Sequence, residues 1–359
     1  MSYASERPLR PGRMRFPDIS PRAYEHPADR GALVALRALP GFDTVLRAVS
    51  GIVGERSVRL LYLATSIRTS VRQYPELHAI VAECATTLDL HPVPELFVTL
   101  NPMPEAVTIG LDKPVIVLST GLLQMVDAEG LRFVVGHEVG HVLSGHAVYR
   151  TLLIQLVNLS QSVSWLAVGS WGLRVIVLAL DEWFRKSELS ADRAGLLCTQ
   201  DPSAALRVHA ALAGALDPDE LDVAGFLDQA KDYQSSRDVR DSVLRLLQVT
   251  GSTHPLASLR AAELQQWAAG PQYRAILAGD YPRRADESGA PIAEDVREAA
   301  ASYSRTFTTT SDPLVGLVGR IGGLAGSVGG AAASRVRTWW QSGRPGEAPD
   351  ADGPEEGRA

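Results

Sequence analysis

The chain has 359 residues, of which 45% are hydrophobic and 21% are charged, and its formal net charge is −6. This composition is typical of one large globular domain or two small ones, and it excludes a disordered, collagen-like or disulfide-stapled protein. The mildly acidic balance argues against nucleic acid as a partner, because phosphate binding requires positive charge. Two cysteines are too few for a disulfide framework or a cysteine-based zinc site.

The N-terminal region combines charged residues and prolines without an apolar run, so we expect no secretory signal peptide and predict a cytoplasmic location. Residues 1–30 are predicted to form an arm without a core of its own. Residues 31–91 are predicted to form a supporting helical region, because apolar residues such as Leu33, Leu36 and Leu39 recur at helical spacing.

The hydrophobic period changes after Pro94. Three short strand-like runs follow, at residues 96–100, 106–109 and 114–118. They predict a small antiparallel sheet with an exposed edge. Thr120 or Asp127 can begin the next helices, and the longer one is expected over 128–143. The pattern up to residue 270 is mostly helical, so the predicted fold class is α+β, mostly helical, with a small antiparallel sheet beside that helix.

The rest of the chain divides by composition. The predicted organisation is a core at 92–270, a helical or loop extension at 271–311, a glycine-rich apolar segment at 312–340 and a disordered tail at 341–359.

A candidate metal-binding motif is the sequence HEVGH at residues 137–141, which is an H-E-x-x-H pattern on the predicted helix. Residues four positions apart lie on one face of a helix, so the imidazoles of His137 and His141 can converge on one metal ion. Glu138 lies one position off that face, where it can reach a water molecule beside the ion without being a ligand. The motif therefore predicts a zinc site with Glu138 as the general base.

A catalytic zinc ion usually has three protein ligands and one open position for water. His146 is the nearest candidate for the third ligand, but its spacing from His137 places it half a turn away from the shared face. The metzincin pattern is excluded, because Ser144 and Ala147 stand where its glycine and its third histidine would be.

Glu188 is the preferred third ligand. It stands four positions before Asp192 on a predicted helix, where Glu188 would bind zinc and Asp192 would hold a ligand histidine by a hydrogen bond. Further along the chain, His254 precedes Pro255, and Arg260 follows six positions after the histidine. His254 is a candidate donor to the oxyanion of peptide hydrolysis, and Arg260 is a candidate partner of Asp192.

These motifs resemble family forty-eight of the metallopeptidases, which contains the CAAX prenyl endopeptidases and the HtpX-like heat-shock proteases. The resemblance covers about residues 90–270 and rests on Gly121-Leu122-Leu123, the glycine-preceded motif at 136–141, Glu188 with Asp192, and His254-Pro255 with Arg260. It implies a gluzincin core in which His137, His141 and Glu188 hold one zinc ion and Glu138 is the base. It also implies that the strand at 114–119 binds substrate by strand addition. The four membrane spans of HtpX-like proteins are not expected, because no segment before residue 92 is long and apolar enough.

The predicted function is a zinc endopeptidase that hydrolyses protein or peptide substrates, with a role in protein quality control. The alternative is a zinc-binding, proteolytically latent scaffold or chaperone-like protein that binds extended polypeptides. The intact Glu138 argues against this alternative, since a protein without hydrolytic activity needs no base. An aminopeptidase would need a site for a free amino group, and no sequence feature indicates one.

Two segments are candidates for peripheral contact with the inner face of a membrane. Residues 151–180 are largely apolar, but they connect two motifs that would share one ion, so a single span would separate these motifs. Helices outside the bilayer, or a hydrophobic lid over the cleft, are therefore preferred there. Residues 314–333 contain GxxxG spacings, which suit helix packing in lipid and suit a flexible linker equally well. The sequence leaves the oligomeric state open.

Overall fold

The structure is a computed structural model that describes residues 12–37, 39, 42, 44–46, 55–162, 171–215, 217, 220–235 and 256–289. All of them belong to the first of two units, which spans Met1–Val318, and the second unit spans Gly319–Ala359. The candidate membrane segment at 314–333 and the predicted tail at 341–359 lie outside the described residues.

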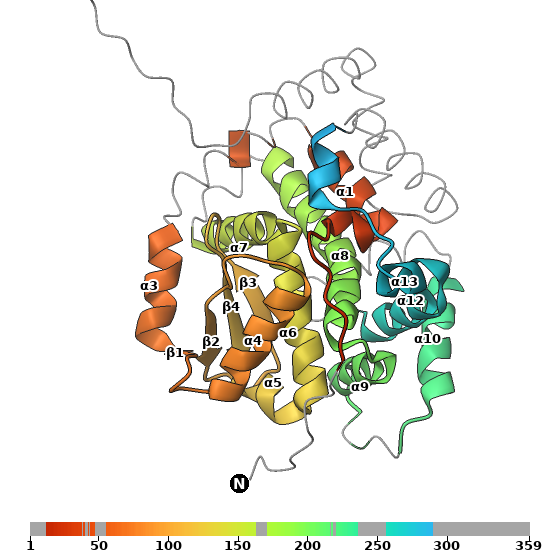
Figure 1. Ribbon diagram of the computed structural model, residues 1–359. Coiled ribbons are helices and arrows are strands. Elements are labelled where there is room, and N and C mark those ends of the chain that lie inside the picture. The colour runs from red at the N-terminus through yellow and green to blue at the C-terminus, as the bar shows by residue number, and fades with distance from the viewer. Residues whose placement is uncertain are drawn as a thin grey trace, which may run out of the picture. The chain divides into compact units, whose positions relative to one another are not determined.

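Helices make up most of the described chain, as the fold class predicts (Figure 1). They are α1 (Pro27–Arg37), α3 (Glu55–Thr65), α4 (Pro75–Thr87), α5 (Thr120–Met125), α6 (Ala128–Leu143), α7 (His146–Ser162), α8 (Trp171–Thr199), α9 (Pro202–Ala213), α10 (Val223–Ser235), α12 (Ala257–Ala269) and α13 (Pro271–Leu277), with 3-10 helices at Pro21–Ala23 and Arg284–Gly289.

Four short strands form one sheet beside α6. They are β1 (Ile67–Arg68), β2 (Leu96–Thr99), β3 (Ala106–Ile109) and β4 (Val115–Ser119), in the spatial order β1-β2-β4-β3. β3 pairs antiparallel with β4, and β1 pairs antiparallel with β2. β2 and β4 are parallel, with Phe97 opposite Val117. The sheet is therefore mixed and not purely antiparallel, because the chain turns back after β3 and places β4 beside β2 in the direction of β2.

The strand at 114–119 is not an edge strand, which corrects the expectation that it adds a substrate strand. β4 has β2 on one side and β3 on the other, so its backbone amides and carbonyls are engaged in both directions. The edge on the side of the H-E-x-x-H helix is β3, which contacts both α6 and α7. Strand addition on this side of the sheet would therefore have to use β3.

The helix α6 begins where the sequence predicts. Asp127 caps it, and its side chain accepts a hydrogen bond from the Gly130 amide, which satisfies one of the free amides of the first turn. Ser119 caps α5 in the same way by accepting a hydrogen bond from the Leu122 amide. The aspartate thus fixes the register in which α6 presents its two histidines.

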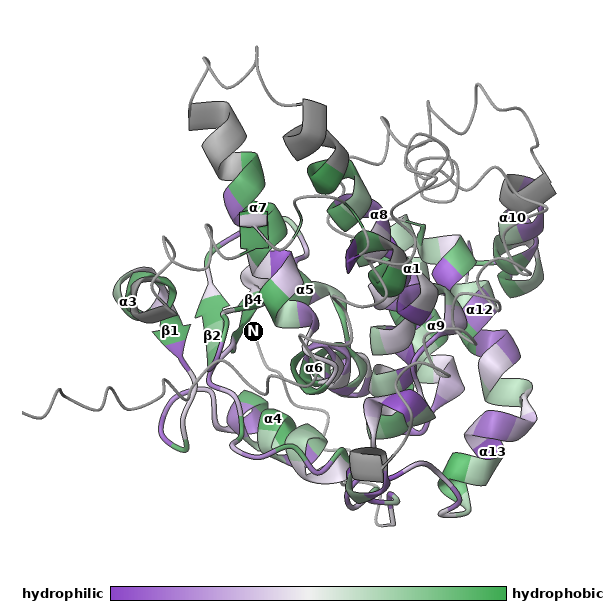
Figure 2. Ribbon diagram, turned by 90° about the horizontal axis from the view of Figure 1, so that it is seen from above, coloured by the Kyte–Doolittle hydropathy of each residue, from purple (hydrophilic) through white to green (hydrophobic). Residues whose placement is uncertain are grey.

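The helix α6 is buried between the sheet and α4 on one side and α8 and α9 on the other (Figure 2). Its contact with α8 is very close, because glycines face α8. A Cβ atom built on Gly140 would lie 2.4 Å from Ala194 Cβ, and one built on Gly136 would lie 2.5 Å from Cys198 Cβ. This close approach brings the helix that carries Glu188 against the H-E-x-x-H motif.

The described residues of the predicted N-terminal arm belong to the main core. Phe16, Ile19 and Tyr24 are fully buried in the same cluster as Leu77 of α4 and Val135 of α6. The described part of this segment therefore completes the core of the rest of the chain.

Within the described part of the chain, no helix combines the length and the apolar character that a membrane span requires. The segment at 151–180 forms parts of α7 and α8, and residues 163–170 between them are not described. Residues 236–255, which belong to the stretch with a mostly helical pattern, also lie outside the described residues.

Candidate metal centre

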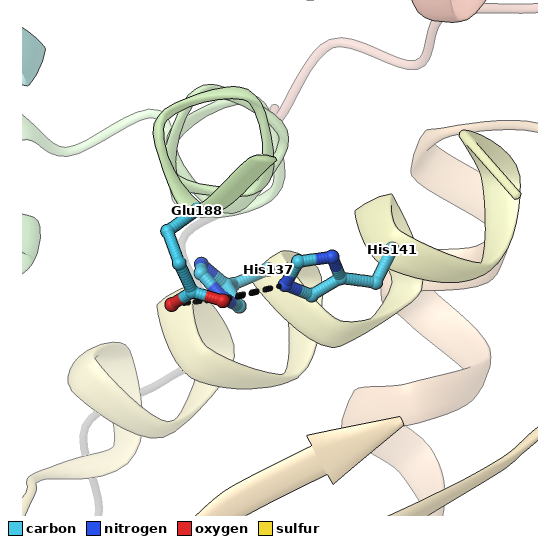
Figure 3. Close-up of side chains that lie close together, drawn as sticks. All are labelled: His137, His141 and Glu188. Atoms are coloured by element: carbon cyan, nitrogen blue, oxygen red, sulfur yellow. Dashed lines mark hydrogen bonds and ion pairs between the residues drawn. The ribbon is translucent and has the colours of Figure 1, made fainter. Parts of the chain in front are cut away.

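The structure brings together His137, His141 and Glu188, the three predicted ligands (Figure 3). The Nε2 atoms of the two histidines are 3.1 Å apart. Glu188 Oε2 lies 3.5 Å from His137 Nε2, and Glu188 Oε1 lies 3.2 Å from His141 Nε2. The helix α6 supplies both imidazoles and α8 supplies the carboxylate, so the site depends on the contact between these two helices.

The chemistry of this donor set fits a divalent cation such as zinc. Two imidazole nitrogens and one carboxylate oxygen lie within 4.8 Å of one another, and all three residues are buried. Both Nδ1 atoms are engaged elsewhere, with Asp192 for His137 and with His146 for His141. Both Nε2 atoms therefore face the carboxylate, which is the arrangement of a three-ligand zinc site.

Asp192 and Arg260 contact two of the three candidate ligands, His137 and Glu188. Asp192 Oδ1 lies 3.0 Å from His137 Nδ1. Arg260 of α12 donates to Asp192 through Nε at 2.8 Å and through Nη2 at 2.6 Å. Its third nitrogen, Nη1, lies 2.8 Å from Glu188 Oε2. One guanidinium thus fixes two carboxylates, which orients one histidine and one candidate ligand together.

The cluster shifts the pKa of its carboxyl groups downward. Burial opposes the charged form of Asp192, but the positive charge of Arg260 holds its pKa below the ordinary range. Burial also opposes the charged form of Glu188, and Arg260 together with His137 holds that pKa well below the ordinary range. Both carboxylates are therefore ionised near neutral pH, as a metal ligand and a hydrogen-bond acceptor require.

The two histidines differ in their protonation. Burial lowers the pKa of His141 to about 4, so its imidazole is neutral. Burial also acts against the charged form of His137, but Glu188 and Asp192 raise its pKa to about 9. A metal ion that bound this set would therefore displace a proton from His137.

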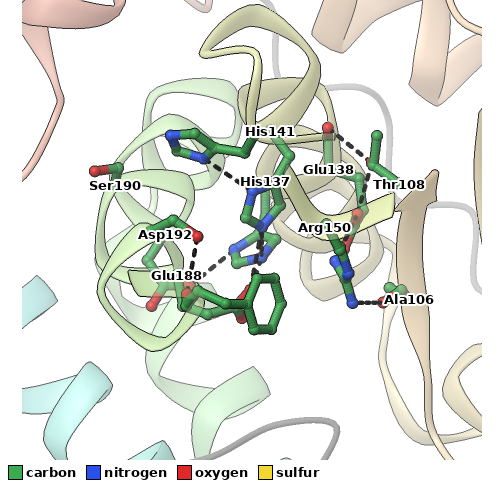
Figure 4. Close-up of polar contacts among 12 residues, drawn as sticks. Ala106, Thr108, His137, Glu138, His141, Arg150, Glu188, Ser190 and Asp192 are labelled. Atoms are coloured by element: carbon green, nitrogen blue, oxygen red, sulfur yellow. Dashed lines mark hydrogen bonds and ion pairs between the residues drawn. The ribbon is translucent and has the colours of Figure 1, made fainter. Parts of the chain in front are cut away.

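Glu138 lies beside the ligands and is buried against the edge strand (Figure 4). Thr108 of β3 donates a hydrogen bond to Glu138 Oε2 at 2.7 Å. Arg150 of α7 places Nη1 3.8 Å from the same oxygen and donates through Nη2 to the Ala106 carbonyl at 3.3 Å. A cleft opens here, and its lining includes Ala106, Val134, His137, Glu138, Arg150 and Glu188. Glu138 thus lines the same cleft as His137 and Glu188.

Three residues around this site were not among the predicted site residues. Thr108 and Arg150 contact Glu138, and His146, which the helical spacing sets aside as a ligand, lies behind His141 with the two Nδ1 atoms 3.0 Å apart. The two-residue period of a strand, which places Thr108 on the same face as Ala106, is the sequence signal that points to Thr108. His254 lies outside the described residues, so its predicted role as an oxyanion donor stays a prediction.

Comparison with known proteins agrees with this geometry. The profile of Peptidase family M48 matches residues 72–268. The chain is similar to the plastoglobule-localized metallopeptidase 48, chloroplastic, of Arabidopsis thaliana, with 33% identity over 267 residues that cover 73% of this chain and 77% of that protein. It is also similar to Protease HtpX homolog 1 of Streptomyces coelicolor, with 31% identity over 202 residues that cover 48% of this chain and 66% of that protein.

A shorter similarity links the chain to the Protease HtpX homolog of Moorella thermoacetica, with 32% identity over 113 residues that cover 31% of this chain and 37% of that protein. No solved structure matches the chain significantly. The family match spans α4 to α12 and includes both motif-bearing helices. The protein therefore belongs to Peptidase family M48 and is a metallopeptidase of that family.

Proposed function

We propose that the protein is a zinc-dependent endopeptidase that holds one zinc ion per chain through His137, His141 and Glu188. The observation that carries this proposal is the convergence of three buried ligand atoms within 4.8 Å of one another. A zinc ion bound there would supply Lewis-acid chemistry, which polarises water and a peptide carbonyl. The carboxylate of Glu138 is beside this set and outside it, which is the position that a base requires.

Glu138 is the proposed general base. It would accept a proton from the attacking water and then deliver that proton to the leaving amine. Thr108 donates its hydroxyl to Oε2 of Glu138, so Oε1 is left for the proton transfer. Asp192 would keep the ring of His137 in place, and Arg260 would keep Asp192 in place. His254 is the proposed donor to the oxyanion.

Extended protein segments are the proposed substrates, and the outer edge of β3 is where they would pair. The Ala106 carbonyl points to this edge, because the preceding carbonyl of Glu105 accepts from the Ser119 amide on the β4 side and successive carbonyls of a strand point to opposite sides. The Ala106 carbonyl accepts a hydrogen bond from Arg150 of α7. The same edge borders the cleft that Glu138, His137 and Glu188 line. A substrate strand along β3 would therefore pass the base with its backbone extended, which suits cleavage within a chain. A role in protein quality control and a peripheral position on the inner face of a membrane stay predictions.

The test is metal analysis of the purified protein together with digestion of unfolded casein. We expect about one zinc ion per chain, hydrolysis that is lost on treatment with a chelator, and recovery when zinc is added back. Glu188→Ala should lose both zinc and activity, whereas Glu76→Gln, a change at an exposed glutamate of α4, should keep both. Zinc without hydrolysis would support the latent scaffold instead. A protein that binds no zinc would contradict the proposal.

A further inference from the structure

A buried chain of side chains leads from His141 away from the cleft and ends in the N-terminal helix α1. His141 Nδ1 lies 3.0 Å from His146 Nδ1. His146 Nε2 lies 3.2 Å from Asp29 Oδ2. The side chains of His141, His146 and Asp29 are 0%, 3% and 2% exposed, so water cannot replace any member of this series.

Asp29 is held in position from α8. Ser190 donates its hydroxyl to Asp29 Oδ2 at 2.6 Å, and the same hydroxyl oxygen accepts a hydrogen bond from the His26 amide at 2.9 Å. The indole ring of Trp183 meets the ring of His146 edge-on, with the two centroids 5.4 Å apart. The carboxylate and the second imidazole are therefore both fixed before any metal binds.

Metal binding would fix which atom donates in each hydrogen bond of this series. A histidine that binds a metal through Nε2 carries its proton on Nδ1, so His141 would donate from Nδ1 to His146 Nδ1. His146 would then carry its own proton on Nε2 and donate it to Asp29. Each donor meets an acceptor, and the series ends at a carboxylate. This is the arrangement that orients a ligand imidazole and increases its basicity.

The two candidate ligand histidines thus receive different support. His137 is held directly by Asp192, which lies within the family match at residues 72–268. His141 is supported through His146 by Asp29, which precedes that match. We propose that Asp29 and His146 are positioning residues for His141, and that α1 thereby completes the metal site. This inference rests on the proposed binding of zinc.

The experiment measures zinc affinity by competition with a chromophoric chelator, and the thermal unfolding midpoint with and without zinc. The variants are Asp29→Asn, His146→Leu and His146→Gln in the full chain. Asp18→Asn is the matched control, because Asp18 is a carboxylate of the same N-terminal segment that pairs with Arg284 and not with the histidine series.

We expect Asp29→Asn and His146→Leu to bind zinc about 10- to 100-fold more weakly, which is the usual effect of removing an outer partner of a metal ligand. His146→Gln should recover part of this loss, because its amide oxygen can accept from His141. The increase in midpoint that zinc produces should shrink in Asp29→Asn and stay unchanged in Asp18→Asn.

Affinities within twofold of the wild type in both Asp29→Asn and His146→Leu would overturn the role of these residues. So would a lower midpoint of the metal-free variant with an unchanged increase on adding zinc, since this is what a purely structural role produces. Asp29→Asn keeps the size of the side chain, so it remains informative if His146→Leu fails to fold. A wild-type protein that binds no zinc would overturn the proposed function, and the two failures are thereby distinguished.

Discussion

At the scale of single residues, Arg260 holds two carboxylates of the candidate metal site in position. It contacts Asp192 through two nitrogens and Glu188 through the third. A buried carboxylate without a partner is costly, and here two carboxylates lie within reach of one guanidinium. Glu188, Asp192 and Arg260 therefore depend on one another for their charge balance, although they come from α8 and α12.

Glu138→Gln tests the role of the base. The amide keeps the shape of the side chain but cannot accept a proton, so hydrolysis should fall by about 100- to 10,000-fold. Zinc content should stay at the wild-type level, because Glu138 is outside the ligand set. Peptide hydrolysis and metal analysis on the same sample give the answer. Normal cleavage by this variant would show that another group is the base.

Asp192 predicts a dependence of stability on pH in the metal-free protein. Its pKa in the folded state is below its ordinary value of 3.8, because Arg260 outweighs the effect of burial. The ionised carboxylate therefore contributes its full stabilisation above about pH 4, and this contribution is lost as the pH falls through the folded-state pKa. Urea unfolding between pH 6 and pH 3 should show a flatter dependence for Asp192→Asn than for the wild type.

The control for this prediction is Asp112→Asn, a change at an exposed aspartate. Its unfolding free energy should follow the wild-type dependence on pH. If the curves of Asp192→Asn and the wild type ran parallel, ionisation of Asp192 would not be the source of the stabilisation.

At the scale of elements, the candidate metal site depends on how closely α6 and α8 approach. Gly136 and Gly140 of α6 face Cys198 and Ala194 of α8, and neither glycine position has room for a Cβ atom. The candidate ligands of α6 and of α8 lie close together because these positions are small. The glycine inside the H-E-x-x-H motif is thus explained by packing.

Gly140→Ala should separate the two helices. Its Cβ would lie 2.4 Å from Ala194 Cβ, and overpacking of this kind typically costs about 1–3 kcal/mol. We expect a lower unfolding free energy and weaker zinc binding, measured by urea unfolding and chelator competition. The double variant Gly140→Ala with Ala194→Gly restores the space and should recover much of both. Failure of this rescue would show that the close helix contact is not what Gly140 provides.

The order of the strands in the sheet cannot be predicted from the pattern of each strand alone. The strand-like runs of β2, β3 and β4 are visible in the sequence, and the structure confirms them. Their order is not visible, because only the pair of β3 with β4 joins strands across a short turn, while β1 pairs with β2 across the helix α4 and β2 pairs with β4 past β3. The assignment of the edge, and with it the place for substrate pairing, follows only from that order.

At the scale of the whole molecule, the N-terminal segment is part of the enzyme core. Phe16 is 1% exposed and packs in the main cluster, whereas its neighbour Met14 is 47% exposed. Phe16→Ala should therefore lower the unfolding free energy by about 3–5 kcal/mol, as for other buried phenylalanines. Met14→Ala is the control and should change it by less than about 0.5 kcal/mol. Similar small effects of both changes would show that the segment does not belong to the core.

The sequence by itself determined the motif helix, its cap at Asp127, and the placement of Glu188 and Asp192 four positions apart on a second helix. These follow from helical periodicity and from the ligand chemistry of zinc, which are local rules. The sequence offered Arg260 as a candidate partner of Asp192, but tertiary structure alone brought the two together from α12 and α8. It also decided that β3 is the edge strand beside α6, that Thr108 and Arg150 contact Glu138, and that Asp29 lies behind His141. These contacts join segments far apart in the chain, such as Asp29 and His146. No local pattern encodes such distances, because burial and packing of the whole chain determine them.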